Sequence, residues 1–200
     1  MGYDLLVRFL VAGDDASGKH ELIQTFTRRP PPSNQGETTL HVTRGEVDGR
    51  SVKLHIWSLG GTSRTVTRAA LESVDVVFFC FDCGDRESLT NMKEWVRDTL
   101  DFAHDDPTFA QRVRWYIVVT NALADAAVTP EECTALAQSL GVTMFRFPEG
   151  RRIADVDYAF NFAVKQHAKA LESAGRLESS PCSARDIGLS FIPFLRSSQH

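Results

Sequence analysis

The chain has 200 residues, of which 42% are hydrophobic, and it carries a formal net charge of −4 at pH 7. This length and apolar content allow one substantial core, so we expect one domain over residues 1–172, followed by a linker and tail over 173–200. The weakly acidic balance excludes the basic field that binds nucleic acid or anionic lipid, and apolar runs of about eight residues are too short to span a membrane.

The chain contains four cysteines and no secretory signal pattern, which favours reduced thiols in a cytoplasmic protein, either free or associated with a complex or the cytoskeleton. Cys80 and Cys83 have the spacing of half a zinc site, but no second pair completes it. We therefore expect Cys80 in a strand and Cys83 in a loop. The terminal Ser-Ser-Gln-His lacks a prenylation cysteine, so no direct lipid anchor is predicted.

Apolar runs alternate with helical periods along the chain. Residues 5–12 read as a buried strand, and 39–47 and 52–57 alternate in period two around Asp48-Gly49, which predicts a β-hairpin. Further strands are predicted over 74–81, 114–120 and 142–147, and helices over 21–26, 87–102, 130–140 and 156–171. This order predicts an α/β fold with three layers (αβα) and a six-stranded, mostly parallel sheet that has one antiparallel edge strand.

Two segments fall outside this pattern. Residues 28–36 form a loop that contains three consecutive prolines, which exclude a regular helix. The tail segment 187–195, IGLSFIPFL, is too apolar for a solvated end. It either folds back on the domain or docks on a partner.

The segment GDDASGKH, residues 13–20, nearly matches the phosphate loop Gly-x-x-x-x-Gly-Lys-[Ser/Thr], and it stands between a predicted strand and a predicted helix. Gly13 and Gly18 would let the backbone N–H groups face phosphate oxygens, and Lys19 would add a positive charge. His20 replaces the hydroxyl that binds Mg²⁺, and imidazole is a poor substitute. Asp15 would place a carboxylate beside the phosphates, at a cost of about 1 kcal/mol or more. The predicted phosphate-binding residues are Gly13, Asp15, Ala16, Ser17, Gly18, Lys19 and His20.

The phosphate loop, the hairpin, LHIWSLGGTSR (54–64) and FDCGDRESLTNMKEW (81–95) together resemble small GTPases of the Ras superfamily over about residues 4–172. The segment LHIWSLGGTSR is similar to the start of the second switch in Arf and septation-type, Rab-like members. The resemblance implies the P-loop NTPase (small G-protein) fold. It also implies that Ser58 stands in place of the Mg²⁺-binding Asp, Gly61 at the γ-phosphate, and Thr62 in place of the Gln that orients the attacking water.

The remaining family positions are partly kept. Thr39, or its neighbour Thr38, takes the place of the first-switch Thr. Asn121 matches the Asn of Asn-Lys-x-Asp, whereas alanines occupy the Lys and Asp places and Asp125 follows one residue late. Gly150 lies where its N–H could meet the base. The resemblance makes GTP or GDP the candidate cofactor. The usual metal positions are occupied by His20, Thr39 and Ser58, so Mg²⁺ is not expected to be held firmly.

The first hypothesis is a small GTPase-like protein that binds guanine nucleotide, hydrolyses GTP weakly or not at all, and acts through protein contacts at residues 28–39, 60–70 and 187–195. The alternative is a nucleotide-free pseudo-GTPase that serves as a scaffold in a larger assembly. A phosphate-loop kinase is disfavoured because no lid-like arginine cluster follows the loop.

Overall fold

The core of the fold is one six-stranded sheet with the order β2-β3-β1-β4-β5-β6. A computed structural model describes residues 2–29, 38–59, 68–123 and 126–177. Among the described strands, only β2 and β3 pair antiparallel, which confirms the predicted sheet with its antiparallel edge strand. The strands are β1 Leu5–Ala12, β2 Thr39–Val47, β3 Arg50–Ser58, β4 Val76–Asp82, β5 Arg114–Thr120 and β6 Thr143–Arg146.

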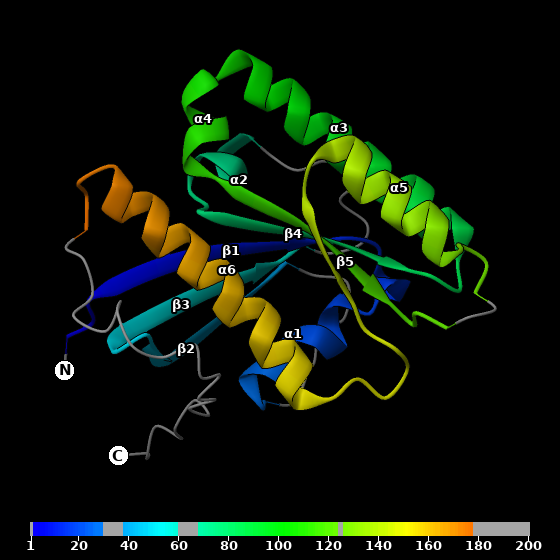
Figure 1. The fold of residues 1–200 in the computed structure, drawn as a ribbon, viewed down its shortest axis with the longest axis horizontal. Helices are drawn as coiled ribbons and strands as arrows, with labels where there is room; N and C mark the ends of the chain where they lie inside the picture. Colours follow the sequence, from blue (N-terminus) through cyan, green and yellow to red (C-terminus); the bar gives the residue numbers. More distant parts are fainter. Residues whose placement is uncertain (1, 30–37, 60–67, 124–125, 178–200) are drawn as a thin grey trace.

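Helices cover both faces of this sheet (Figure 1). Alternate side chains of β1 divide between two apolar clusters: Phe9 belongs to the cluster that contains side chains of α1 and α6, whereas Leu10 belongs to the cluster that contains side chains of α3 and α5. Such two-sided burial explains why the central strands read as continuous apolar runs. The helices are α1 Lys19–Thr27, α2 Arg68–Glu72, α3 Arg86–Asp105, α4 Pro107–Arg112, α5 Pro130–Leu140 and α6 Ile153–Ser173.

Helix boundaries follow from capping residues wherever the sequence contains such residues, as α5 illustrates. α5 begins at a capping box in which the Thr129 hydroxyl accepts from the Glu132 N–H and the Glu132 carboxylate accepts from the Thr129 N–H. It ends at Gly141, which has a φ of 64°. The short helices α2 and α4 were not predicted, because five or six residues are too few to show a helical period.

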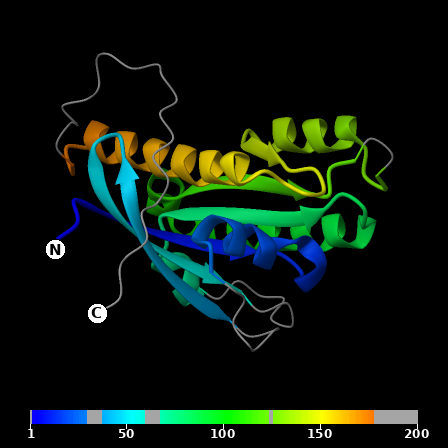
Figure 2. The same ribbon diagram turned by 90° about the horizontal axis from the view of Figure 1, so that it is seen from below.

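The β2–β3 hairpin turns at Asp48 and Gly49, whose φ angles of 51° and 76° are those of a type I′ turn. Two ion pairs join this hairpin to α6: Lys165 Nζ lies 2.7 Å from Asp48 Oδ1, and Arg50 Nη1 lies 2.6 Å from Glu172 Oε1. The hairpin tip therefore lies beside the C-terminal part of α6 (Figure 2).

The described cysteines are buried free thiols. Cys80 lies in β4 and Cys83 in the turn after it, as predicted, but Cys83 is buried as completely as Cys80. Its Sγ donates to the carbonyl of Val128 and lies 3.8 Å from Cys133 Sγ. In the described part of the chain, no group of His, Cys, Asp or Glu side chains suits a metal ion, and no helix is long and apolar enough to cross a membrane.

Candidate nucleotide-binding site

The predicted phosphate loop forms the bend between β1 and α1. The chain leaves the sheet at Gly13, passes through a 3₁₀ turn over Asp15–Ser17 and enters α1 after Gly18. Gly13 has a φ of 148°, and a Cβ placed on it would lie 2.5 Å from the carbonyl oxygen of Cys80 in β4. Only glycine allows so close a passage over the neighbouring strand. The loop lies at the carboxyl ends of the parallel strands, where ligands bind in open α/β sheets.

Lys19 extends into the bend of this loop and is fully buried. Its Nζ donates to the Asp14 carbonyl at 2.8 Å and lies 3.2 Å from Asp15 Oδ1. A buried ammonium requires such partners, because desolvation of an unpaired charge is very costly. The loop therefore holds its one lysine at the centre of the bend, the position from which a phosphate group would be contacted.

Three contacts from distant parts of the chain hold the loop backbone and Asp14. Thr120 Oγ1 donates to the Ser17 carbonyl at 2.8 Å, and Arg151 Nη1 donates to the Gly18 carbonyl at 3.1 Å. Asn91 Nδ2 donates to Asp14 Oδ2 at 2.8 Å. The sequence analysis did not identify Thr120, Arg151 or Asn91. Arg151 carried a signal nonetheless, because it directly follows Gly150, which the sequence analysis placed near the base.

The three predicted metal positions lie at the same end of the sheet. Ser58 pairs in register with Val11 on one side and Thr39 on the other, next to the phosphate loop. Among the described residues, neither Ser58 Oγ nor His20 Nε2 has a hydrogen-bond partner, although both are buried. Burial, and secondarily the charge of Lys19, lowers the pKa of His20, so its imidazole is neutral at pH 7.

These side chains fit a magnesium ion poorly. Mg²⁺ is held by hard oxygen ligands, usually one or two carboxylates. Here the positions supply an imidazole at His20 and a serine hydroxyl at Ser58. The hydroxyl of Thr39 lies 3.2 Å from Nε2 of His41.

The segment that would contact a base lies beside the same loop. Asn121 follows Thr120 directly and has a φ of 49°; its Nδ2 donates to Asp82 Oδ2 at 2.6 Å. The amide donors of Asn121 are thus directed to β4. Gly150, with a φ of 69°, precedes the Arg151 that contacts Gly18. Of the other predicted site residues, Ala16 and Ser17 lie in the loop, whereas Gly61, Thr62 and Asp125 lie outside the described residues.

The hairpin next to the site exposes two large apolar side chains that the sequence analysis missed. Leu40 of β2 and Trp57 of β3 are paired across the two strands and are 42% and 36% exposed. Their alternation within the hairpin is the signal that could have identified them. The predicted contact segments 28–39 and 60–70 are described only at 28–29, 38–39 and 68–70, and 187–195 lies outside the described residues.

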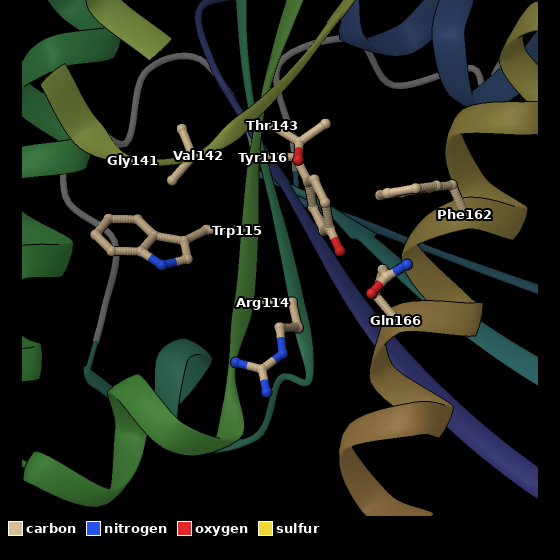
Figure 3. A pocket seen from close by; sticks show the side chains of 8 residues that line it. All are labelled: Arg114, Trp115, Tyr116, Gly141, Val142, Thr143, Phe162 and Gln166. Atoms are coloured by element: carbon tan, nitrogen blue, oxygen red, sulfur yellow. The ribbon is translucent and has the colours of Figure 1, made fainter. Parts of the chain in front are cut away.

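A separate cavity of about 310 Å³ lies at the opposite end of β5 from Thr120. Figure 3 shows Tyr116 and Gln166 on the α6 side of the strand and Trp115 on the other side. No predicted site residue lines this cavity. Its walls are Arg114, Trp115, Tyr116, Gly141, Val142, Thr143, Phe162 and Gln166.

Comparison with known proteins agrees with this architecture. The model of the Ras family matches residues 8–169. The human Ras-related protein Rab-40A-like is 29% identical over 148 residues, which make up 72% of this chain and 51% of that protein. The Ras-related protein Rab-2B of Dictyostelium discoideum is 26% identical over 180 residues, which make up 86% of this chain and 85% of that protein.

The chain thus spans about half the length of the Rab-40 relatives that it matches. The GTP-binding protein YPTM2 of Zea mays is 26% identical over 189 residues, 91% of this chain and 87% of that protein. Because the family model extends from β1 into α6, and the sheet order and phosphate loop agree with it, the chain belongs to the Ras family of small GTPases and is Rab-like.

Proposed function

We propose that the protein binds guanine nucleotide through the loop at residues 13–20, hydrolyses GTP weakly or not at all, and acts through protein contacts on the face next to this loop. The observation that carries the proposal is the buried Lys19 at the centre of a loop whose other contacts hold its backbone in place. Backbone N–H groups and this lysine can cradle phosphates without the residues that the chain has replaced.

The residues at the metal positions support weak hydrolysis. GTPases of this class stabilise the transferred phosphoryl group with Mg²⁺ and orient the water with a glutamine. This chain has His20 and Ser58 where the metal is usually held, and Thr62 where the glutamine usually stands. We therefore expect single-turnover incubation with GTP to release inorganic phosphate slowly, at or little above the rate of a sample without the protein.

Nucleotide occupancy tests the binding part of the proposal. Protein purified under native conditions is denatured, and the supernatant is resolved on an anion-exchange column. Release of GDP or GTP in nearly equimolar amount is the expected result. A supernatant without nucleotide, together with no thermal shift on addition of GDP or GTP, would contradict it, because a ligand that binds only the native state must raise the melting temperature.

The effect of Mg²⁺ is tested separately. We expect the thermal shift with GTP to be the same with and without Mg²⁺ in the wild-type protein, because His20 offers no oxygen ligand. In a His20→Ser variant the added hydroxyl should make the shift depend on Mg²⁺. No gain in that variant would mean that the missing carboxylate at Ser58 dominates. A strong Mg²⁺ effect in the wild type would refute the argument about His20.

The second candidate function is a nucleotide-free scaffold, and the base-contacting segment favours it. The amide donors of Asn121 are directed to Asp82, and Ala122 follows where the family has lysine. A base held without these contacts would contribute little affinity and little selectivity for guanine. The absence of a thermal shift with either ATP or GTP would support this reading over a guanine-specific switch.

The exposed pair Leu40 and Trp57 supports protein contact at this end of the molecule, because adjacent large apolar side chains on a surface are typical of interaction sites. A photo-crosslinking residue placed at position 40 should form discrete protein adducts in cells. The same residue at position 158 is the control, since Tyr158 on α6 is 44% exposed but lies on a different element. Identical adducts from both positions would argue against a specific contact face.

A further inference from the structure

The phosphate loop already contains an anion. Asp15 Oδ1 lies 3.2 Å from Lys19 Nζ and 3.7 Å from His20 Nε2, so one carboxylate oxygen faces both nitrogen-bearing side chains of the loop. Lys19 is fully buried, whereas the Asp15 side chain is 53% exposed. The ammonium charge is thus balanced from inside the loop by a carboxylate that reaches in from the solvent side.

A bound phosphate would need this same ammonium. The loop contains a single lysine, and its Nζ is enclosed by the Asp14 carbonyl and by Asp15. Because a carboxylate and a phosphate oxygen are both anionic acceptors that pair with an ammonium at hydrogen-bond distance, they compete for the same donor. We propose that Asp15 is an internal anion that competes with the phosphates of a nucleotide for Lys19 and thereby sets the affinity of the site. The inference rests on the proposed function, since it assigns a regulator to that nucleotide site.

The contacts of the loop with Thr120, Arg151 and Asn91 do not depend on Asp15. The loop backbone is held by Thr120 at Ser17 and by Arg151 at Gly18, and Asp14 is held by Asn91; none of these contacts involves Asp15. The half-exposed Asp15 side chain can turn toward water, whereas buried Lys19 cannot. Asp15 therefore lowers affinity for anions in two ways: it occupies the ammonium beforehand, and its charge repels phosphate after displacement.

The test compares the wild type with Asp15→Asn, which removes the charge and nearly keeps the shape. Binding of GDP and of inorganic tripolyphosphate to nucleotide-stripped full-length protein is measured by titration calorimetry. We expect the variant to bind both anions about tenfold more tightly, the scale set by a like charge a few ångströms from the phosphates. Glu21→Gln is the matched control, because Glu21 carries the same charge and is an exposed residue in the first turn of α1. It should change either affinity by less than about twofold.

Each outcome decides between the inference and the function on which it rests. If the wild type binds GDP and Asp15→Asn binds it no more tightly, the inference is wrong and the proposed function stands. If no form binds GDP but Asp15→Asn binds tripolyphosphate more tightly than the wild type, the inference stands and the proposed function fails. Equal tightening in Glu21→Gln, absence of binding in every form, or weaker binding by Asp15→Asn with a lower melting temperature would each overturn the inference.

Discussion

The chain enters the phosphate loop at Gly13, where the neighbouring atoms leave no room for a side chain. A Cβ at position 13 would lie 2.5 Å from the carbonyl oxygen of Cys80 and 2.7 Å from the Ser17 hydroxyl oxygen. Cys80 is in the middle of β4, which pairs with β1 and β5, so its carbonyl cannot move away cheaply. We therefore expect Gly13→Ala to destabilise the fold as well as the loop.

The size of the effect follows from two causes. A φ of 148° is a conformation that residues with a side chain rarely adopt, which costs about 1–3 kcal/mol. Forcing a methyl group into a filled space costs about 1–3 kcal/mol more. We expect Gly13→Ala to lower the free energy of unfolding by about 4 kcal/mol.

Urea-induced unfolding followed by far-ultraviolet circular dichroism measures this loss. Gly141→Ala is the control, because Gly141 also has a positive φ, of 64°, but no atom lies within 4 Å of a Cβ placed there. It should cost only about 1 kcal/mol, the price of the left-handed backbone alone. Equal losses in the two variants would refute the close approach of the loop to β4.

Three further predictions concern the buried side chains of Asp157, of two cysteines and of His167. Arg28 and Asp157 form an ion pair in which the Asp157 side chain is 8% exposed and the Arg28 side chain 35% exposed. Arg28→Ala should lower the free energy of unfolding by about 3 kcal/mol, because it leaves the Asp157 charge buried without its partner, and Asp157→Ala should lower it by less. Equal losses in the two variants, measured by urea unfolding, would contradict this. Burial raises the pKa of Cys80 to about 12 and that of Cys133 to about 11, so both thiols should resist iodoacetamide at pH 8 until the protein is unfolded, as peptide mass spectrometry can establish. Burial lowers the pKa of His167 from 6.5, so the unfolded chain takes up a proton at this histidine more readily than the folded chain. The urea midpoint should therefore fall as the pH drops through about 6.5. A His167→Gln variant whose midpoint depends on pH as strongly as that of the wild type would show that other groups cause the fall.

The layered fold could be predicted because its signals are local. β1, β2 and β5 begin and end where the apolar runs and the alternation predicted, and α5 does so because its cap residues and Gly141 are both readable. Other boundaries moved by a few residues: α3 extends to Asp105, beyond the predicted end at 102. Helix ends without a marked cap depend on the packing around them, which a local pattern does not contain.

The candidate site could likewise be predicted from the sequence only in part. The residue types at positions 13–20 determined by themselves that the chain bends there around one lysine, because glycine torsions and the order of strand and helix are properties of the local chain. Only the tertiary structure decided where that lysine directs its charge and what holds the loop. Arg151 reaches Gly18 across 133 positions of sequence. The pairing of Leu40 with Trp57 likewise depends on strand register, so contacts of this kind arise from the packing of the sheet rather than from any one segment.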